Sequence, residues 1–263
     1  MIGSRLTGGK VEVLLLNHKG SLIFEALIRP ARIKVNEKII FNNSSGFSGV
    51  VSAKNEITFS ATDLNAIYSH GQMPLPPYIK REPEDLDSNY YQTVYAKIEG
   101  AIASPTAGLH FTKSLINNLV SIGINIGYLT LHVGYGTFHP VSVEDITEHK
   151  MEAEYFSIPQ ETLKLIEHTQ GLKAKIFAVG TTSLRALETY SLGQREGEAD
   201  LFIYPGFKFR ITDCLVTNFH LPRTTLFMLV CAFAGEKLIK KAYQEAIDKK
   251  YRFYSYGDAM LII

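Results

Sequence analysis

The sequence predicts an α/β fold with a large mixed sheet, accompanied by a small all-β domain that resembles a barrel. Two changes along the chain indicate this. Residues 10–59 alternate short apolar runs with turns rich in Gly, Asn, Ser and Pro, whereas residues 112–251 alternate helical and strand patterns. Between them, Met73–Pro83 contains four of the ten prolines and runs into an acidic stretch, as a connector would. We therefore predict a barrel-like domain over residues 1–75 and an α/β domain over residues 76–263.

The first domain is predicted to consist of short strands. Each strand is bounded by turn residues, and a series of this kind is typical of barrels and sandwiches. The strands are expected at Lys10–Leu16, Ser21–Arg29, Glu37–Phe41, Phe47–Ala53 and Glu56–Phe59.

In the second domain, capping residues mark the starts of helices. Thr112 can cap a helix that ends before Gly123, and Pro159 suits the start of another because its missing amide is not needed there. Apolar residues at helical spacing predict the other helices, and short alternating runs predict the strands. The further helices are expected at Leu184–Tyr190, Thr225–Ala234 and Glu236–Tyr251, and the strands at Ile124–Val133, Lys173–Val179, Leu201–Tyr204 and Phe207–Ile211.

Composition excludes several classes of protein. The 263 residues are 46% hydrophobic and 20% charged, which provides a core and excludes a disordered chain. The formal net charge is only +1, so any contact with nucleic acid must be local. Cys214 and Cys231 form no C-x-x-C pair, which argues against a disulfide framework or a cysteine zinc site. The longest apolar run, Leu226–Ala234, is far below the roughly 20 residues of a membrane span, so we expect a cytoplasmic protein without membrane contact.

Two regions carry a local excess of positive charge. The last helix and its end, residues 236–252, hold six basic residues against three acidic ones, and residues 1–73 hold eight against five. The pattern alone favours a solvated helix face over a contact with phosphates. Together the two regions still allow an RNA-binding surface on a nearly neutral protein.

Four polar segments rich in small residues adjoin apolar elements. Ligands gather at such places in open α/β sheets, because strand ends and helix starts present unpaired amides there. We expect the four turns to line one pocket. The segments are residues 105–111, 131–140, 179–185 and 217–223.

Some of these segments have simpler interpretations. Gly134–Gly136 lacks the third glycine of a dinucleotide fingerprint, so a tight turn is the better interpretation. Gly180–Ser183 could be an ordinary helix cap, although Arg185 strengthens the alternative of an anion site. Arg185 and Glu188 lie one helical turn apart and could equally form a surface pair.

The eight histidines do not indicate a metal site. None shows the i, i+4 pairing of an H-E-x-x-H motif, and no carboxylate sits at a matching offset, so we expect no metal. A histidine on a strand, such as His132, is most often a hydrogen-bonded core residue. The place of His132 just before a glycine turn also makes it a candidate for proton transfer near neutral pH.

A series of motifs follows one order through the second domain. The motifs are PLPPYIKR (74–81), YQTVYA (91–96), PTAGLHFT (105–112), LHVGYGTF (131–138), VGTTSLRALE (179–188), DLFIYPGF (200–207), TNFHLPR (217–223) and YRFYSYGDAMLI (251–262). At these motifs the chain resembles the S-adenosylmethionine:tRNA ribosyltransferase-isomerase family of queuosine biosynthesis. Such a series is far more specific than any of its motifs alone.

The resemblance implies a transfer reaction on RNA. The family moves the ribosyl group of S-adenosylmethionine onto the aminomethyl-deazaguanine base at the wobble position of tRNA, giving epoxyqueuosine and releasing adenine and methionine. S-adenosylmethionine is thus expected as a substrate, and the anticodon stem-loop of a tRNA with the modified wobble guanine as the partner. Because the positive sulfur makes the neighbouring carbon easier to deprotonate, no metal is needed. We expect the enzyme to be a monomer.

The resemblance also implies which residues build the pocket. A base must remove a proton beside the sulfur, and an acid must assist the departure of adenine. For catalysis we expect His110, His132 and Asp258. The residues expected to bind S-adenosylmethionine are Thr106, Gly108, Gly134, Thr181, Thr182, Arg185, Asn218 and His220.

The chain departs from the family pattern in two places. Family members begin with several tens of residues before the β module, as part of the α/β domain, whereas here Met1 is followed at once by Ile2-Gly3. His139 stands where the family usually carries Arg, which weakens an anion contact at neutral pH. An alternative to the enzyme is therefore a truncated, catalytically incompetent RNA-binding fragment of it.

Overall fold

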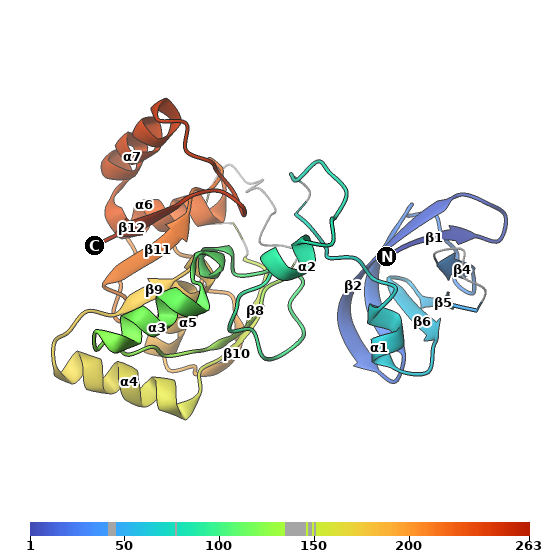
Figure 1. Cartoon of the computed structure of the whole chain (residues 1–263), viewed down its shortest axis with the longest axis horizontal. Coiled ribbons are helices and arrows are strands. Elements are labelled where there is room, and N and C mark those ends of the chain that lie inside the picture. The colour runs from blue at the N-terminus through green and yellow to red at the C-terminus, as the bar shows by residue number, and fades with distance from the viewer. Residues whose placement is uncertain (42–45, 77, 135–145, 147–148, 150) are drawn as a thin grey trace. The chain divides into compact units, whose positions relative to one another are not determined.

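A closed barrel of six antiparallel strands forms the N-terminal part of the chain (Figure 1). Its order is β1-β2-β3-β6-β5-β4, and β1 closes it by pairing with both β2 and β4. The structure is a computed structural model, and it describes residues 1–41, 46–76, 78–134, 146, 149 and 151–263. The strands are β1 (Ile2–Arg5), β2 (Lys10–Gly20), β3 (Ile23–Arg29), β4 (Lys38–Phe41), β5 (Ser48–Ala53) and β6 (Glu56–Ser60).

The barrel interior follows the alternation of the sequence. Val11, Val13, Phe24 and Ala26 are buried, because successive side chains of a strand point to opposite faces. The barrel-like domain and its expected strands are thus confirmed. Sequence reasoning misses β1, whose four residues include Gly3, a residue type that is depleted in strands.

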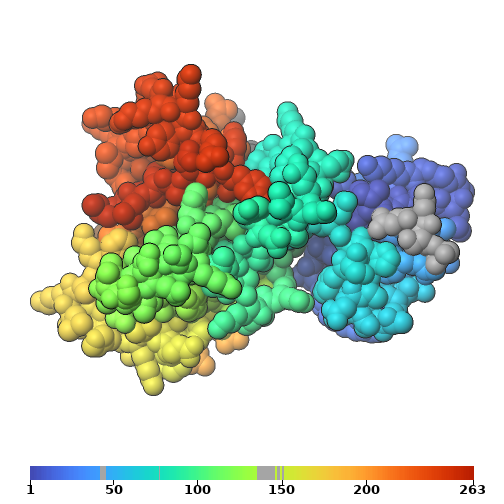
Figure 2. Space-filling model, in the orientation of Figure 1, coloured from blue at the N-terminus to red at the C-terminus, as the bar shows by residue number. Residues whose placement is uncertain are grey.

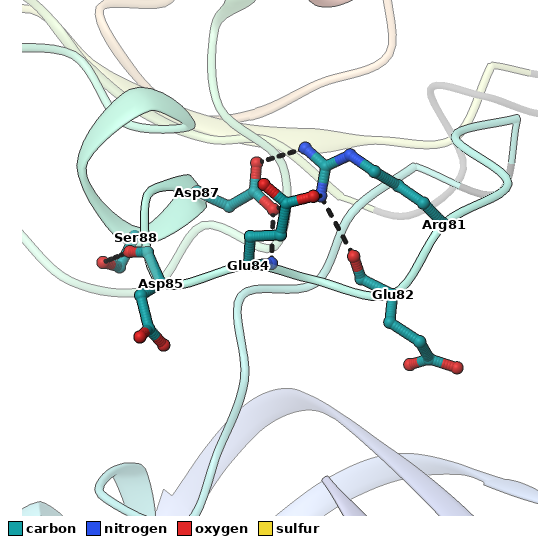
Figure 3. A network of polar contacts seen from close by, with 6 residues as sticks. All are labelled: Arg81, Glu82, Glu84, Asp85, Asp87 and Ser88. Carbon is teal, nitrogen blue, oxygen red and sulfur yellow. Dashed lines mark hydrogen bonds and ion pairs between the residues drawn. The ribbon is translucent and has the colours of Figure 1, made fainter.

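An ion-pair network shapes the stretch that follows the barrel (Figure 3). Asp87 is buried and accepts hydrogen bonds from both terminal guanidinium nitrogens of Arg81, at 2.6 and 2.7 Å. It also accepts one from the backbone N–H of Glu84, at 2.8 Å. The acidic end of the expected connector therefore has a defined structure. The two short helices of this region are α1 (Leu64–Tyr68) and α2 (Asp87–Tyr90).

The chain forms two compact units, residues 1–89 and 90–263. The expected domain limit between residues 75 and 76 stays a prediction. In the second unit, helices alternate with strands, which confirms the α/β class. The helices are η1 (Thr106–His110, a 3-10 helix), α3 (Lys113–Ser121), α4 (Gln160–Gly171), α5 (Thr181–Ser191), α6 (Thr225–Ala234) and α7 (Glu236–Asp248).

The strands of the second unit lie in two sheets of three strands within the described residues. One sheet has the order β10-β8-β7 and is antiparallel. The other has the order β12-β11-β9 and is mixed, because β11 runs antiparallel to β12 and parallel to β9. The mixed sheet is thus confirmed, with three strands among the described residues. The strands are β7 (Thr130–His132), β8 (Glu154–Ser157), β9 (Phe177–Val179), β10 (Glu196–Ala199), β11 (Cys214–Asn218) and β12 (Ala259–Ile262).

The strands expected at Leu201–Tyr204 and Phe207–Ile211 are wrong, since both stretches are irregular. Ile203 and Ile211 are buried, which explains their apolar pattern. The backbone N–H groups of residues 210–212 do not bond to a neighbouring strand but donate to the carboxylate of Glu188. These residues are therefore buried although they are not paired with a neighbouring strand.

The expected helices are confirmed, and their caps follow the sequence. The Thr112 hydroxyl accepts a hydrogen bond from the backbone N–H of Leu115 at 3.1 Å, and Pro159 is the residue before α4. Helix α3 lies on the surface of its unit, with every residue exposed or half-buried (Figure 2). The core instead surrounds α5, β11 and α6, where Leu184, Leu215 and Val230 are fully buried. Among the described residues, no helix has the length and apolar character to cross a membrane.

Candidate active site

Asn218, at the end of β11, joins three parts of the chain. Its side-chain nitrogen Nδ2 lies 3.3 Å from Nε2 of His110, on η1. The same nitrogen donates to backbone carbonyls of the loop before β12, at 3.1 Å to Tyr254, 3.4 Å to Ser255 and 3.4 Å to Gly257. Asn218 is buried, and its Oδ1 has no hydrogen-bond partner in the part of the chain that the structure describes.

The turn at Gly180 brings the start of α5 to the same place. Gly180 links β9 to α5 with φ of 95°, a left-handed conformation that favours glycine. Its backbone N–H donates to the Val216 carbonyl of β11 at 2.8 Å. A Cβ atom at Gly180 would lie 3.8 Å from the Cβ of Ala107, on η1. The segments around residues 107, 180 and 218 therefore adjoin one another, as three of the four polar turns are expected to do.

Asp258 and Arg252 close the loop before β12 and carry the charges near His110. The Asp258 carboxylate accepts hydrogen bonds from the backbone N–H of Arg252 at 2.7 Å and from its guanidinium at 3.1 Å. These bonds lower the pKa of Asp258, so the carboxylate is charged at neutral pH. Desolvation lowers the pKa of His110, while the charge of Asp258 acts in the opposite direction.

His220 is engaged by its own neighbours. Its Nε2 lies 2.7 Å from the hydroxyl of Thr217, and its backbone N–H donates to the phenol oxygen of Tyr243 at 2.8 Å. Desolvation lowers the pKa of His220 to about 4, so the imidazole is neutral near pH 7. This histidine supports the corner between β11 and α6 from within the protein.

The first turn of α5 carries Thr181 and Thr182, and both are buried. Gly180 is the cap position of this helix, but no side chain caps it, so the interpretation of Gly180–Ser183 as a cap made by hydroxyl groups is wrong. The amide groups of the first turn are thus left without the hydroxyl partner that this interpretation requires.

Arg185 and Glu188 do not form the surface pair that their spacing allows, and both are buried. Arg185 forms an ion pair with Glu154 of β8. Glu188 accepts hydrogen bonds from the backbone N–H groups of residues 210–212, at 2.8, 3.2 and 2.9 Å. Burial lowers the pKa of Arg185 to about 10, which leaves the guanidinium charged. The two side chains therefore tie α5 to β8 and to the segment before β11.

His132 and Gly134 lie at the end of β7, and the contacts of His132 differ from those of the group around Asn218. The imidazole of His132 packs against the ring of Tyr155, with 5.2 Å between centroids. It also covers Gly100 so closely that a Cβ atom there would clash with its Nδ1. These contacts do not join His132 to Asn218. Residues 135–140 of the same motif, including His139, lie outside the described residues.

Thr106 and Gly108 belong to η1, the helix that ends in His110. Thr106 is half-buried and Gly108 is buried. A Cβ atom at Gly108 would clash with the phenol oxygen of Tyr95, so this close approach requires glycine. In the described residues, no group of three His, Cys, Asp or Glu side chains could hold a metal ion.

The model of the family described as "Queuosine biosynthesis protein" matches residues 1–262. The chain belongs to this family. It is 51% identical over 262 residues to the S-adenosylmethionine:tRNA ribosyltransferase-isomerase of a Sulfurihydrogenibium species, covering 98% of this chain and 78% of the relative. The protein of that name from Aquifex aeolicus is 46% identical over 269 residues, covering 100% of this chain and 80% of the relative.

A solved structure is also similar to this member of the queuosine biosynthesis family. It is the S-adenosylmethionine tRNA ribosyltransferase of Thermotoga maritima, with 32% sequence identity and a TM-score of 0.49. The match covers 100% of this chain and 78% of that one. The family assignment rests on the sequence matches above.

Sequence reasoning misses residues that hold the site of this family member together. Glu154 pairs with Arg185 across 31 positions of the chain, and no local spacing could indicate that partner. Arg252 lies within the YRFYSYGD motif, six positions before Asp258, and opposite charges so close in one loop are a signal that could have been found.

Proposed function

We propose that this protein transfers the ribosyl group of S-adenosylmethionine to tRNA in queuosine biosynthesis. The product is epoxyqueuosine, and adenine and methionine are released. The observation that carries this proposal is the match over nearly the whole chain, at 46–51% identity, to relatives named S-adenosylmethionine:tRNA ribosyltransferase-isomerase. The same matches support the enzyme rather than an incompetent RNA-binding fragment.

The reaction needs a base, a group that assists the departure of adenine, and a neutral amine as the nucleophile. A base removes a proton from the ribose carbon beside the positive sulfur, and the amine of the modified base attacks in its neutral form. Adenine leaves with help from a hydrogen-bond donor or an acid. His110, His132 and Asp258 are our proposed catalytic residues, and two of them lie at the corner that Asn218 organises. The sulfonium itself acidifies the carbon, so we propose no metal.

The start of α5 and the adjoining turns are proposed to bind S-adenosylmethionine. Thr181 and Thr182 stand at a helix start with no side-chain cap, where free amides suit a carboxylate. Asn218 is a further proposed binding residue, and its buried Oδ1 has no hydrogen-bond partner in the described part of the chain. Arg185 and His220 are also proposed to bind it, with one nitrogen of each already paired, Arg185 with Glu154 and His220 with Thr217. The remaining proposed binding residues are Thr106, Gly108 and Gly134.

We propose the anticodon stem-loop with the modified wobble guanine as the RNA partner, a monomeric state and a cytoplasmic location. The basic residues of α7 support a solvated face rather than a dedicated RNA contact. Lys240 pairs with Glu236 at 2.5 Å and Lys249 with Glu245 at 2.7 Å, each across one helical turn. Such pairs neutralise part of the positive charge of α7.

The proposed function is tested by incubating the protein with S-adenosylmethionine and a stem-loop that carries the aminomethyl-deazaguanine base. We expect adenine and methionine in equal amounts and a matching gain in the mass of the RNA. A stem-loop with ordinary guanine is the control and should release neither product. Folded protein that releases no adenine from the modified RNA would refute the proposal.

A further inference from the structure

The loop before β12 determines the orientation of the Asn218 amide. Three backbone carbonyls, those of Tyr254, Ser255 and Gly257, lie 3.1–3.4 Å from the same side-chain atom. Carbonyl oxygens only accept hydrogen bonds, so the atom that faces them must be the NH₂ group and not the oxygen. Of the two orientations of this amide, only one satisfies the surrounding groups.

This orientation determines which ring nitrogen of His110 carries the proton. The same NH₂ group faces Nε2 of the imidazole at 3.3 Å. The amide nitrogen shares its two N–H bonds among the carbonyls and Nε2 and cannot accept a hydrogen bond, so Nε2 faces a donor and carries a lone pair and no proton. A neutral imidazole carries one proton, which must then sit on Nδ1.

We propose that Asn218 is a positioning residue that holds His110 as the neutral tautomer with its proton on Nδ1. The ring then acts as a fixed hydrogen-bond donor in the reaction, and not as the base. In that role it stabilises the electron pair that adenine receives when its bond to the ribose breaks; adenine leaves as its anion and takes its proton from water, while His110 keeps its own. This chemical role rests on the proposed function, whereas the tautomer rests on the geometry alone.

The surroundings of His110 favour the neutral ring. Protonation of Nε2 would place two N–H groups against each other, and turning the buried Asn218 amide would bring its oxygen against three carbonyl oxygens. Partial desolvation and the charge of Arg252 oppose a second proton, and the charge of Asp258 favours it. His110 lies at the surface as a residue.

Nitrogen NMR spectra of the free protein with ¹⁵N-labelled histidine test the tautomer directly. The signals of His110 are identified by their loss in the His110→Gln variant. We expect Nδ1 to be protonated and Nε2 unprotonated at pH 7, the reverse of the tautomer that free imidazole side chains prefer. A proton on Nε2, or a charged ring at pH 7, would overturn the inference.

Two further variants test the cause. In Asn218→Ala, His110 should lose its preference for Nδ1–H. In Thr217→Val, the matched control on the same strand, the hydroxyl beside His220 is removed and the His110 signals should stay unchanged. A wild-type tautomer that survives in folded Asn218→Ala would show that another group sets it.

The rate of adenine release separates a donor from a base. Gln offers both a donor and an acceptor at position 110 but cannot titrate. If His110 is a fixed donor, His110→Gln should keep the rate within about tenfold, while His110→Ala should lose about 10²–10³-fold. Equal losses in both variants would overturn the donor role. A protein with the expected tautomer that releases no adenine in any form would count against the proposed function and not against the tautomer.

Discussion

His220 links the stability of the protein to pH. Desolvation lowers its pKa to about 4 from the ordinary value of 6.5, so the unfolded chain binds the proton more tightly. The free energy of unfolding is therefore not reduced by this group above about pH 6.5, and it falls as the pH drops from 6.5 toward 4. We expect the free energy of unfolding to fall by about 1–2 kcal/mol from pH 7 to pH 5 through this group.

Urea unfolding at the two pH values measures the effect of His220. The variant His220→Gln should lose this part of the pH dependence. The exposed His168 provides the matched control, since His168→Gln should keep the wild-type slope. If the free energy of unfolding of His220→Gln depends on pH as it does in the wild type, another group causes this pH dependence.

Gly180 supports the start of α5 by its backbone conformation. With φ of 95°, an alanine at this position would be strained by about 1–2 kcal/mol, although its Cβ would meet Ala107 at an ordinary 3.8 Å. We expect Gly180→Ala to lower the free energy of unfolding by that amount and to weaken the binding of S-adenosylmethionine in calorimetry. Gly171 is the control position, because it has no left-handed φ and an alanine methyl there would meet no atom within 4 Å.

At the scale of elements, α5 is held at two points along its length. Arg185→Met leaves the Glu154 carboxylate buried without its cation, and such a loss typically costs about 3–5 kcal/mol. We expect Arg185→Met to unfold at much lower urea concentration than the wild type.

The double variant Arg185→Met/Glu154→Leu tests whether the loss comes from the stranded charge. Removing both charges should recover a large part of the stability, because a buried ion pair can be replaced by apolar groups at little cost. If the double variant is as unstable as the sum of the two single variants, the contribution of the pair is packing and not charge.

The helices were predictable from the sequence because their signals are local. Thr112 caps α3 and apolar spacing identifies α6 and α7, and all of these use residues within a few positions of one another. The apolar stretch 201–211 was wrongly predicted to form strands because its structure depends on a distant residue. Its backbone hydrogen bonds go to Glu188, more than 20 positions earlier, and no local pattern shows that.

The candidate site was partly predictable for the same reason. Polar stretches rich in small residues beside apolar elements identified the segments around residues 107, 180 and 218, which the structure brings together. The sequence could not show that Arg185 pairs with Glu154, since burial and partner depend on the packing of α5 against a separate sheet.

At the scale of the whole molecule, the barrel has a core of its own. All of its buried core residues, from Val11 to Ile67, precede residue 75. We therefore expect a protein of residues 1–75 to unfold cooperatively in urea, with circular dichroism typical of strands. Residues 1–89, which retain the Arg81–Asp87 ion pair, provide the comparison. A folded 1–89 protein with an unfolded 1–75 protein would move the domain limit to the end of the connector.

The loop that carries Tyr254, Ser255 and Gly257 has a consequence for biosynthesis. Asn218 depends on the carbonyls of this loop, and β12 after it completes the sheet that carries Asn218. A nascent chain on the ribosome therefore cannot assemble this corner until residues 254–262 have left the exit tunnel. Premature termination before the codon for Tyr254 would thus release a chain that has every α-helix found in the described residues and lacks the corner around Asn218.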